Sequence, residues 1–208
     1  MEQQFAPALE QLCKLIETAS RELKMPINFA LIGGLAVSAW GISRATQDID
    51  FLADSDPSPL IERRLRDSLK NILDKHGCHA VWRMGGLDDP IPLLLRIEMT
   101  HSYPELSADI LWVHKRWQRA ALRRSIEVNV MGRRIDVLHP EDLIVMKLDA
   151  GGPQDLLDVQ SLLSSRSRKI SLGRLKAAAA RLKLSTLLET CLKELSGARK
   201  SGLHRNRK

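Results

Sequence analysis

The feature that most constrains this chain is a pair of glycines followed, after thirteen residues, by two aspartates that alternate with apolar residues. Gly33-Gly34 interrupts an apolar run that begins at Phe29, and Asp48-Ile49-Asp50-Phe51 has the period of two of a half-buried strand. The stretch between them is rich in Ala and favours a helix. This order predicts a strand, a glycine turn, a helix and a second strand.

In such a strand Asp48 and Asp50 project to the same side. Two carboxylates this close raise each other's proton affinity unless a divalent cation lies between them or water solvates both. Oxygen ligands of this kind suit Mg²⁺ or Mn²⁺. The alternative is an exposed strand end whose acids are only solvated by water, and the Asp-Ile-Asp motif taken alone favours this alternative. The Gly-Gly turn makes the metal-binding interpretation more favourable, because its backbone N–H groups and the N-terminus of the following helix can approach an anion. Together the motifs predict a phosphate site beside a metal-binding acid pair.

Composition is that of a folded chain that can bury a core, with 44% apolar and 27% charged residues over 208 positions. The uncharged stretch 25–43 contains Pro26, Gly33, Gly34 and Gly41, so it is interpreted as a buried strand plus helix and not as a membrane span. The amphipathic start lacks the basic end and apolar block of a secretory signal. Three cysteines outside any metal-ligand spacing predict free thiols in a reducing cytoplasm.

Periodicity predicts alternating helices and strands first, and helices alone afterwards. The expected helices cover 4–23, 59–76, 141–149, 154–163, 172–182 and 185–195, and the expected strands cover 29–32, 47–52, 79–82, 93–99, 108–113, 125–130 and 133–137. The fold class is therefore α/β (α+β), with a mixed-sheet core over 1–139 and a helical region over 140–199. Residues 200–208 form a disordered basic tail in this interpretation.

Positive charge gathers at the C-terminal end of the sequence. Residues 164–208 hold thirteen Lys or Arg against two acids, which leaves nineteen against twenty-three for residues 1–163. Such a segment either tracks the phosphates of a nucleic acid or forms a solvated cationic helix face, and composition does not decide between the two.

The motif Ile32-Gly33-Gly34 followed by Asp48-Ile49-Asp50-Phe51 resembles the signature of the DNA polymerase β-like nucleotidyltransferase superfamily. The stretch 44–50, and the stretch 140–148 with its continuation 150–158, resemble a bacterial branch of AbiEii-like toxins and minimal nucleotidyltransferases. The resemblance covers residues 30–163. It implies a nucleotidyltransferase core and a metal-dependent enzyme that transfers a nucleoside monophosphate from an NTP to an acceptor hydroxyl.

The resemblance also implies a third carboxylate on a later strand, for which Asp109 is preferred and Asp136 is the competitor. Asp48, Asp50 and Asp109 then bind Mg²⁺ or Mn²⁺ and form the catalytic set, and Asp109 is also a candidate general base. Lys147 is expected to balance charge on the leaving pyrophosphate. The expected nucleotide-binding residues are Gly33, Gly34, Arg44, Thr46 and Lys147.

Two points stay open at this stage. Arg44 and Thr46 either contact phosphate or fix the loop, while Asp155 and Asp158 either orient a cation such as Lys147 or simply favour the start of their own helix, which is preferred.

The family usually carries an Arg where this chain has Gly152. One hypothesis is an active enzyme whose acceptor is RNA, tRNA or a protein side chain, with a separate antitoxin protein as partner, or a small molecule such as an aminoglycoside. The other is a catalytically weakened protein that binds nucleotide, nucleic acid or a protein partner without transfer. Neither hypothesis involves a membrane.

Overall fold

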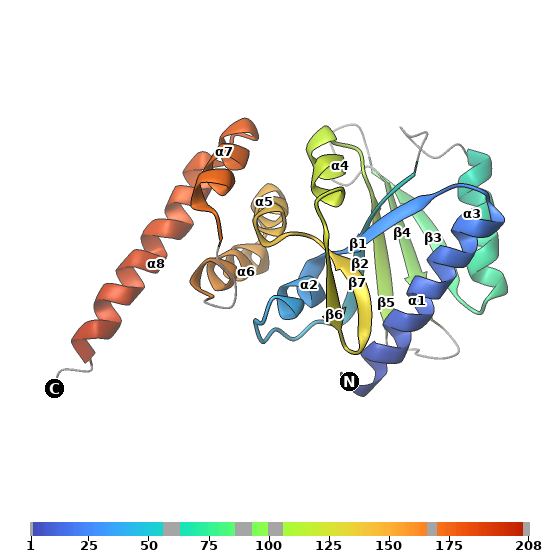
Figure 1. Cartoon of the computed structure of the whole chain (residues 1–208), viewed down its shortest axis with the longest axis horizontal. Helices are drawn as coiled ribbons and strands as arrows, with labels where there is room; N and C mark the ends of the chain where they lie inside the picture. Colours follow the sequence, from blue (N-terminus) through green and yellow to red (C-terminus); the bar gives the residue numbers. More distant parts are fainter. Residues whose placement is uncertain (1, 56–62, 86–92, 100–105, 166–169, 206–208) are drawn as a thin grey trace. The chain divides into compact units, whose positions relative to one another are not determined.

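A computed structural model describes residues 2–55, 63–85, 93–99, 106–165 and 170–205 (Figure 1). The chain divides into two compact units. The first consists of Met1–Ala39 and Arg44–Leu138, and the second of Trp40–Ser43 and His139–Lys208. Each unit is described on its own below.

In the first unit, the described residues form a seven-stranded mixed sheet with the order β3-β4-β5-β2-β1-β7-β6. The strands are β1 (Ile27–Leu31), β2 (Asp48–Ser55), β3 (His79–Met84), β4 (Leu93–Glu98), β5 (Ser107–Trp112), β6 (Ile126–Val130) and β7 (Arg133–Val137). The pairs β2/β5 and β1/β7 are parallel, and the other neighbouring pairs are antiparallel. The sheet confirms the predicted mixed α/β fold.

Four helices accompany this sheet in the described part of the first unit: α1 (Glu2–Glu22), α2 (Gly33–Ala39), α3 (Arg63–Lys75) and α4 (Arg116–Leu122). Figure 1 shows α1 lying across the strands. Its apolar side chains at Phe5, Leu9, Leu12 and Ile16 are buried, as the helical spacing predicts. Arg133 of β7 pairs with Glu17 of α1 at 2.6 Å, so α1 covers the sheet face toward which Arg133 points.

The core of the unit lies on that covered face. Strand residues alternate between the two faces of the sheet, and the buried residues of β2 include those that point to the covered face. On β2, Ile49 and Phe51 are fully buried, and the Phe51 ring meets Phe29 of β1 edge to face at 5.5 Å. Asp48 and Asp50 occupy the alternate positions and therefore point to the opposite face, where they are partly exposed.

The second unit is helical over the residues described: α5 (Pro140–Ala150), α6 (Pro153–Ser164), α7 (Leu172–Arg181) and α8 (Ser185–Arg205). Pro140 opens α5 at its first position, and Gly151, at φ 68°, closes it in the left-handed conformation. The helices bury Leu143, Val159, Leu162, Leu175 and Leu188.

Most predicted elements are present within a few residues of their expected bounds. The short helix α4 has no counterpart among the predictions, because its seven residues give too little periodicity to detect. Residues 200–205 differ from the expected disorder and continue α8, because no proline interrupts the helix and each added residue gains a helical hydrogen bond. Residues 59–62 of the expected helix over 59–76, and residues 206–208 of the tail, lie outside the described residues.

Among the residues described, no helix is both long and apolar enough to cross a membrane. The uncharged stretch 25–43 instead contains β1 and α2, as expected. Cys13, Cys78 and Cys191 are free and buried, which confirms the prediction of free thiols. Burial raises the pKa of the Cys13 thiol to about 12.

Candidate active site

Three carboxylates share one sheet face where two neighbouring parallel strands begin. The register of β2 against β5 pairs Asp48 with Ser107 and Asp50 with Asp109. Paired residues of adjacent strands point to the same face, so Asp48, Asp50 and Asp109 lie together opposite the buried core. We call these three residues the acid cluster. Asp136 is on β7, which β1 separates from β2.

The glycine turn lies directly against this cluster. The Ile32 N–H donates to the Asp50 carbonyl oxygen at 2.9 Å, and the chain then turns at Gly33 with φ +63°. A Cβ at Gly33 would lie 1.9 Å from Asp50 Oδ2 and 2.8 Å from Asp50 Cβ. Glycine is required here both for the positive φ and for the close approach to Asp50. The structure therefore brings the two motifs of the sequence pattern into contact.

Gly34 makes a second close approach, to the loop before β2. A Cβ at Gly34 would lie 1.7 Å from Arg44 Nη1 and 3.0 Å from Thr46 Cβ. Arg44 Nη1 also donates to the Ala45 carbonyl at 3.2 Å, and the Thr46 hydroxyl donates to the Asp48 carbonyl at 3.2 Å. Both side chains thus form hydrogen bonds within this loop. Because α2 has only seven residues, a helix dipole adds little to anion binding here.

Arg96 of β4 is a site residue that the sequence analysis missed. Its guanidinium donates to Asp109 Oδ2 at 2.9 Å and to Ser107 Oγ at 2.7 Å, and it lies 3.5 Å from Asp48 Oδ1. Ser107 Oγ also donates to Asp48 Oδ1. The only local signal in the sequence is a lone Arg in the apolar alternation of 93–99, and its acidic partners are identified only by strand order.

The pKa of Asp109 is raised by its surroundings. Burial raises the pKa of the Asp109 carboxyl above its usual range, and the charge of Asp48 raises it further, while Arg96 opposes both effects. Its Oδ2 is bound by Arg96, whereas its buried Oδ1 finds no hydrogen-bond partner in the part of the chain that the structure describes. A buried carboxylate oxygen without a partner is costly for folding and is a feature of functional sites.

The acid cluster contains the type of ligand atom that divalent cations such as Mg²⁺ prefer. Three carboxylates on one face, one of them with a partnerless buried oxygen, are the hard ligands that Mg²⁺ and Mn²⁺ use. Over the described ranges, however, no three acidic, imidazole or thiol groups already converge enough to hold a metal ion. Asp48 is turned toward Ser107 and Arg96, so cation binding by all three acids requires Asp48 to leave them.

Lys147 lies in the second unit, in the middle of α5. Its Nζ forms ion pairs with Asp155 at 2.9 Å and Asp158 at 2.7 Å, both on α6, and its side chain is 7% exposed. Asp155 and Asp158 therefore orient Lys147, which is the less favoured of the two interpretations drawn from the sequence. Gly152 is the N-cap residue of α6 and carries no cation there.

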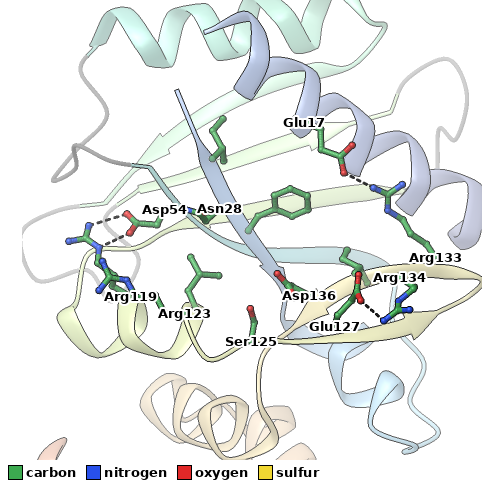
Figure 2. Close-up of a pocket in the computed structure, with 14 residues that line it drawn as sticks. Glu17, Asn28, Asp54, Arg119, Arg123, Ser125, Glu127, Arg133, Arg134 and Asp136 are labelled. Carbon is green, nitrogen blue, oxygen red and sulfur yellow. Dashed lines mark hydrogen bonds and ion pairs between the residues drawn. The ribbon is translucent and has the colours of Figure 1, made fainter. Parts of the chain in front are cut away.

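A polar cavity of about 620 Å³ lies elsewhere in the first unit, between α4, β1, β6 and β7 (Figure 2). Its lining is Glu17, Ile27, Asn28, Phe29, Asp54, Arg119, Leu122, Arg123, Ser125, Glu127, Arg133, Arg134, Ile135 and Asp136.

Most charges of this cavity are paired. Arg119 of α4 grips the buried Asp54 with two bonds of 2.6 and 3.0 Å, and Arg134 pairs with Glu127 at 2.5 Å. Figure 2 shows Asp136 between these two pairs. Partial desolvation raises the pKa of Asp136, and Glu127, directly opposite on β6, adds to the shift. The competitor for the third carboxylate is thus part of the cavity and not of the acid cluster.

A mixed sheet with a glycine turn packed against paired acids on adjacent strands matches the nucleotidyltransferase core that the resemblance in the sequence implies. The family described as "Nucleotidyltransferase of unknown function (DUF6036)" matches residues 8–193, and the chain belongs to that family. The superfamily inferred from the motifs is therefore confirmed. Among curated proteins, no sequence match is significant.

Solved structures with a similar fold include three nucleotidyltransferase-type proteins. ANT(2″)-Ia in complex with adenylyl-2″-tobramycin shares 16% identity over 83% of this chain and 95% of its own, with a TM-score of 0.48. An antigenic nucleotidyltransferase-like protein from Paracoccidioides brasiliensis shares 17% identity over 89% and 92%, with a TM-score of 0.46. Lincomycin-bound LnuA, a lincosamide antibiotic adenylyltransferase, shares 14% identity over 74% and 96%, with a TM-score of 0.43.

Proposed function

We propose that this protein is a divalent-cation-dependent nucleotidyltransferase that moves a nucleoside monophosphate from an NTP to an acceptor hydroxyl. The observation that carries the proposal is the β2/β5 register, which pairs Asp50 with Asp109 beside Asp48. The contact between Gly33 and Asp50 supports it further, because it puts flexible backbone next to the acids.

Asp48, Asp50 and Asp109 are the residues that would hold Mg²⁺ or Mn²⁺. A bound divalent cation would neutralise phosphate charge and lower the pKa of the attacking hydroxyl. In the transfer itself, the acceptor oxygen forms a bond to the α-phosphorus while the bond from that phosphorus to the β-bridging oxygen breaks, and pyrophosphate leaves. Asp109, with a raised pKa and a partnerless Oδ1, is suited to accept the acceptor's proton as general base.

The remaining binding roles in this proposal fall to the groups around the turn and to α5. The backbone at Gly33 and Gly34, with Arg44 and Thr46 beside it, binds the triphosphate. Lys147, oriented by Asp155 and Asp158, balances negative charge on the leaving pyrophosphate.

For the acceptor, we propose RNA or tRNA, with a protein side chain as the other macromolecular choice. Thirteen Lys or Arg against two acids over 164–208 support an RNA partner, because such a segment neutralises phosphates. In the AbiEii-like branch, this activity would be that of a cytoplasmic toxin restrained by an antitoxin protein.

A small polar acceptor is the second candidate, and the cavity favours it. A volume of about 620 Å³ is within the range of small-molecule sites, and the lining includes four acids and four arginines. Asp54, at the cavity wall, lies four residues beyond Asp50 on the same strand and face, or about 13 Å at the usual rise per residue. A hydroxyl-rich molecule of moderate size could therefore reach from the cavity to the acid cluster.

The alternative to an active enzyme is a protein that binds nucleotide or a macromolecule without transfer. The absence of an Arg at Gly152 favours it. Gly152 has a φ of −68°, which any residue adopts, and a Cβ there would meet only the end of the Asp155 side chain, at 3.0 Å. Gly152→Arg is therefore a tolerable substitution, and a variant that gains transfer over an inactive wild type would identify the weakened enzyme.

The proposal is tested by incubating the full chain with Mg²⁺ and each labelled NTP, first with total RNA and then with a panel of small amino- and hydroxyl-bearing compounds. Label transfer by the wild type, lost in Asp50→Asn, is the expected result. Nucleotide binding without transfer to any acceptor would contradict the enzyme.

RNA as acceptor has its own test. Arg174, Lys176 and Arg181 are exposed on α7, so replacing all three with Gln leaves the core intact. The triple variant should bind RNA more weakly and with a smaller salt dependence than the wild type. An unchanged salt dependence would exclude α7 from RNA binding.

A further inference from the structure

Arg96 contacts two members of the acid cluster, Asp48 and Asp109. It lies on β4 opposite Asp109 in the β4/β5 register, so its side chain points to the same sheet face as the acids. Its side chain is 28% exposed, which means that the guanidinium is partly withdrawn from water. Neither the family motifs nor the proposed function assigns it a role.

Its contacts with the acids are unequal. With Asp109 it makes a direct bond of 2.9 Å, whereas it reaches Asp48 only at 3.5 Å and through the hydroxyl of Ser107. The bond to Asp109 uses Oδ2 and leaves Oδ1 without a partner in the described part of the chain. A planar guanidinium that holds one carboxylate oxygen in a fixed direction also fixes the other oxygen of the same group.

Charge adds a second effect. Arg96 places one positive charge against the carboxylates of Asp48 and Asp109. A fixed positive charge within hydrogen-bonding distance of two ligands also repels an incoming cation. Arg96 therefore both orients Asp109 and limits the strength of cation binding.

We propose that Arg96 is a positioning residue of this site: its guanidinium fixes Asp109 with one oxygen available for a cation, and its charge keeps the affinity of the acid cluster for divalent cations low. The proposal rests on the proposed function, because it assumes that these acids bind a cation. It predicts opposite effects on binding and on turnover, which a purely structural ion pair would not produce.

The test is Mn²⁺ binding to the nucleotide-free full-length protein, followed by electron paramagnetic resonance of the free ion. Arg96→Gln should bind Mn²⁺ roughly tenfold more tightly than the wild type, because the repulsive charge is gone. Arg96→Lys keeps the charge and loses the planar fork, so its affinity should stay within about twofold of the wild type. Arg83→Gln is the matched control, because Arg83 acts on Asp109 only through its charge among the interactions that the structure gives, and it should change the affinity less than twofold.

Turnover provides the second measurement. Both Arg96→Gln and Arg96→Lys should lower kcat at least tenfold with little change in the KM for NTP, because Asp109 loses its orientation. Arg96→Lys, with near-normal Mn²⁺ affinity, keeps this test independent of any folding defect in Arg96→Gln.

Mn²⁺ affinity that is unchanged or weaker in Arg96→Gln would overturn the proposal, as would a wild type that binds no Mn²⁺. Full turnover in Arg96→Lys would overturn the positioning role. If the wild type binds Mn²⁺, Arg96→Gln binds it more tightly and no variant transfers a nucleotide, the proposed function fails while the charge effect of Arg96 stands.

Discussion

The acid cluster and the cavity differ in how their charges are paired. At the acid cluster, Asp48 and Asp109 share Arg96, and Asp109 keeps a buried oxygen without a described partner. At the cavity, Asp54 and Glu127 each have an arginine of their own, and acids and arginines are equal in number. A buried carboxylate oxygen without a partner costs stability and is a feature of functional sites, so this difference supports the cation-binding role proposed for the acid cluster.

The largest expected effect comes from replacing the glycine at the acid cluster. Gly33→Ala combines a positive φ with a Cβ only 2.8 Å from Asp50 Cβ, which the β2 backbone holds in place. We expect a loss of roughly 3 kcal/mol in the free energy of unfolding and loss of activity. Gly132→Ala, in the β6–β7 turn at φ +90° with nothing within 4 Å of its Cβ, provides the control and should cost only about 1 kcal/mol. Equal losses, measured by urea unfolding, would show that the turn is not packed on Asp50.

The second-largest effect is expected from breaking the Asp54–Arg119 ion pair at the cavity. Arg119→Ala leaves Asp54, which is 9% exposed, without its two-bond partner. The free energy of unfolding should fall by about 2 kcal/mol, a value reduced because Arg119 is partly exposed. Arg123→Ala, at the exposed C-cap of the same helix, should change it by less than about 0.5 kcal/mol. Similar losses of unfolding free energy in the two variants would show that the ion pair of Arg119 with Asp54 contributes no more to stability than the exposed side chain of Arg123.

The third prediction concerns the pH dependence of stability at the acid cluster. The pKa of Asp109 is raised above its ordinary value of 3.8, so the folded chain binds this proton more tightly than the unfolded chain. The contribution of Asp109 to stability is therefore most favourable below pH 3.8 and falls as pH rises through the folded-state pKa. Asp109→Asn removes this dependence, so its stability relative to the wild type should increase from pH 4 to pH 7. Urea unfolding across this range checks the sign, and a wild type that gains on the variant with rising pH would contradict it.

The smallest expected effect concerns the two neighbouring acids of the cavity, Asp136 and Glu127. Asp136 faces Glu127 across β6 and β7, and like charges in that position destabilise a sheet. Asp136→Asn should raise the free energy of unfolding by about 0.5 kcal/mol at neutral pH. Glu127→Gln removes the same repulsion but also the ion pair with Arg134, so its net effect should be near zero. A destabilised Asp136→Asn variant would mean that this carboxylate has a structural partner.

How far the sequence predicts these two regions depends on the range of the contacts. Gly33, Asp48 and Asp50 lie within eighteen residues, and the turn that joins them follows from spacing and periodicity. Asp109 and Asp136 could not be separated with certainty from the residues, because the choice depends on which strand lies beside β2, and that order is set by the packing of the whole sheet.

The arginine partners of the acids could not be predicted from the sequence for the same reason. Arg96 contacts Asp48 across forty-eight positions, and Arg119 contacts Asp54 across sixty-five. No local period encodes such pairs. The helix that carries Arg119 is also too short to be recognised by its pattern.

The most direct test of the account is the rate of nucleotide transfer in Asp109→Asn compared with Asp136→Asn, two substitutions of the same chemistry, one at the acid cluster and one at the cavity. We predict that Asp109→Asn lowers the rate at least about a hundredfold, as expected for loss of a cation ligand and general base, while Asp136→Asn stays within about threefold of the wild type. A normal rate in Asp109→Asn, or a loss confined to Asp136→Asn, would contradict the assignment of the acid cluster as the active site.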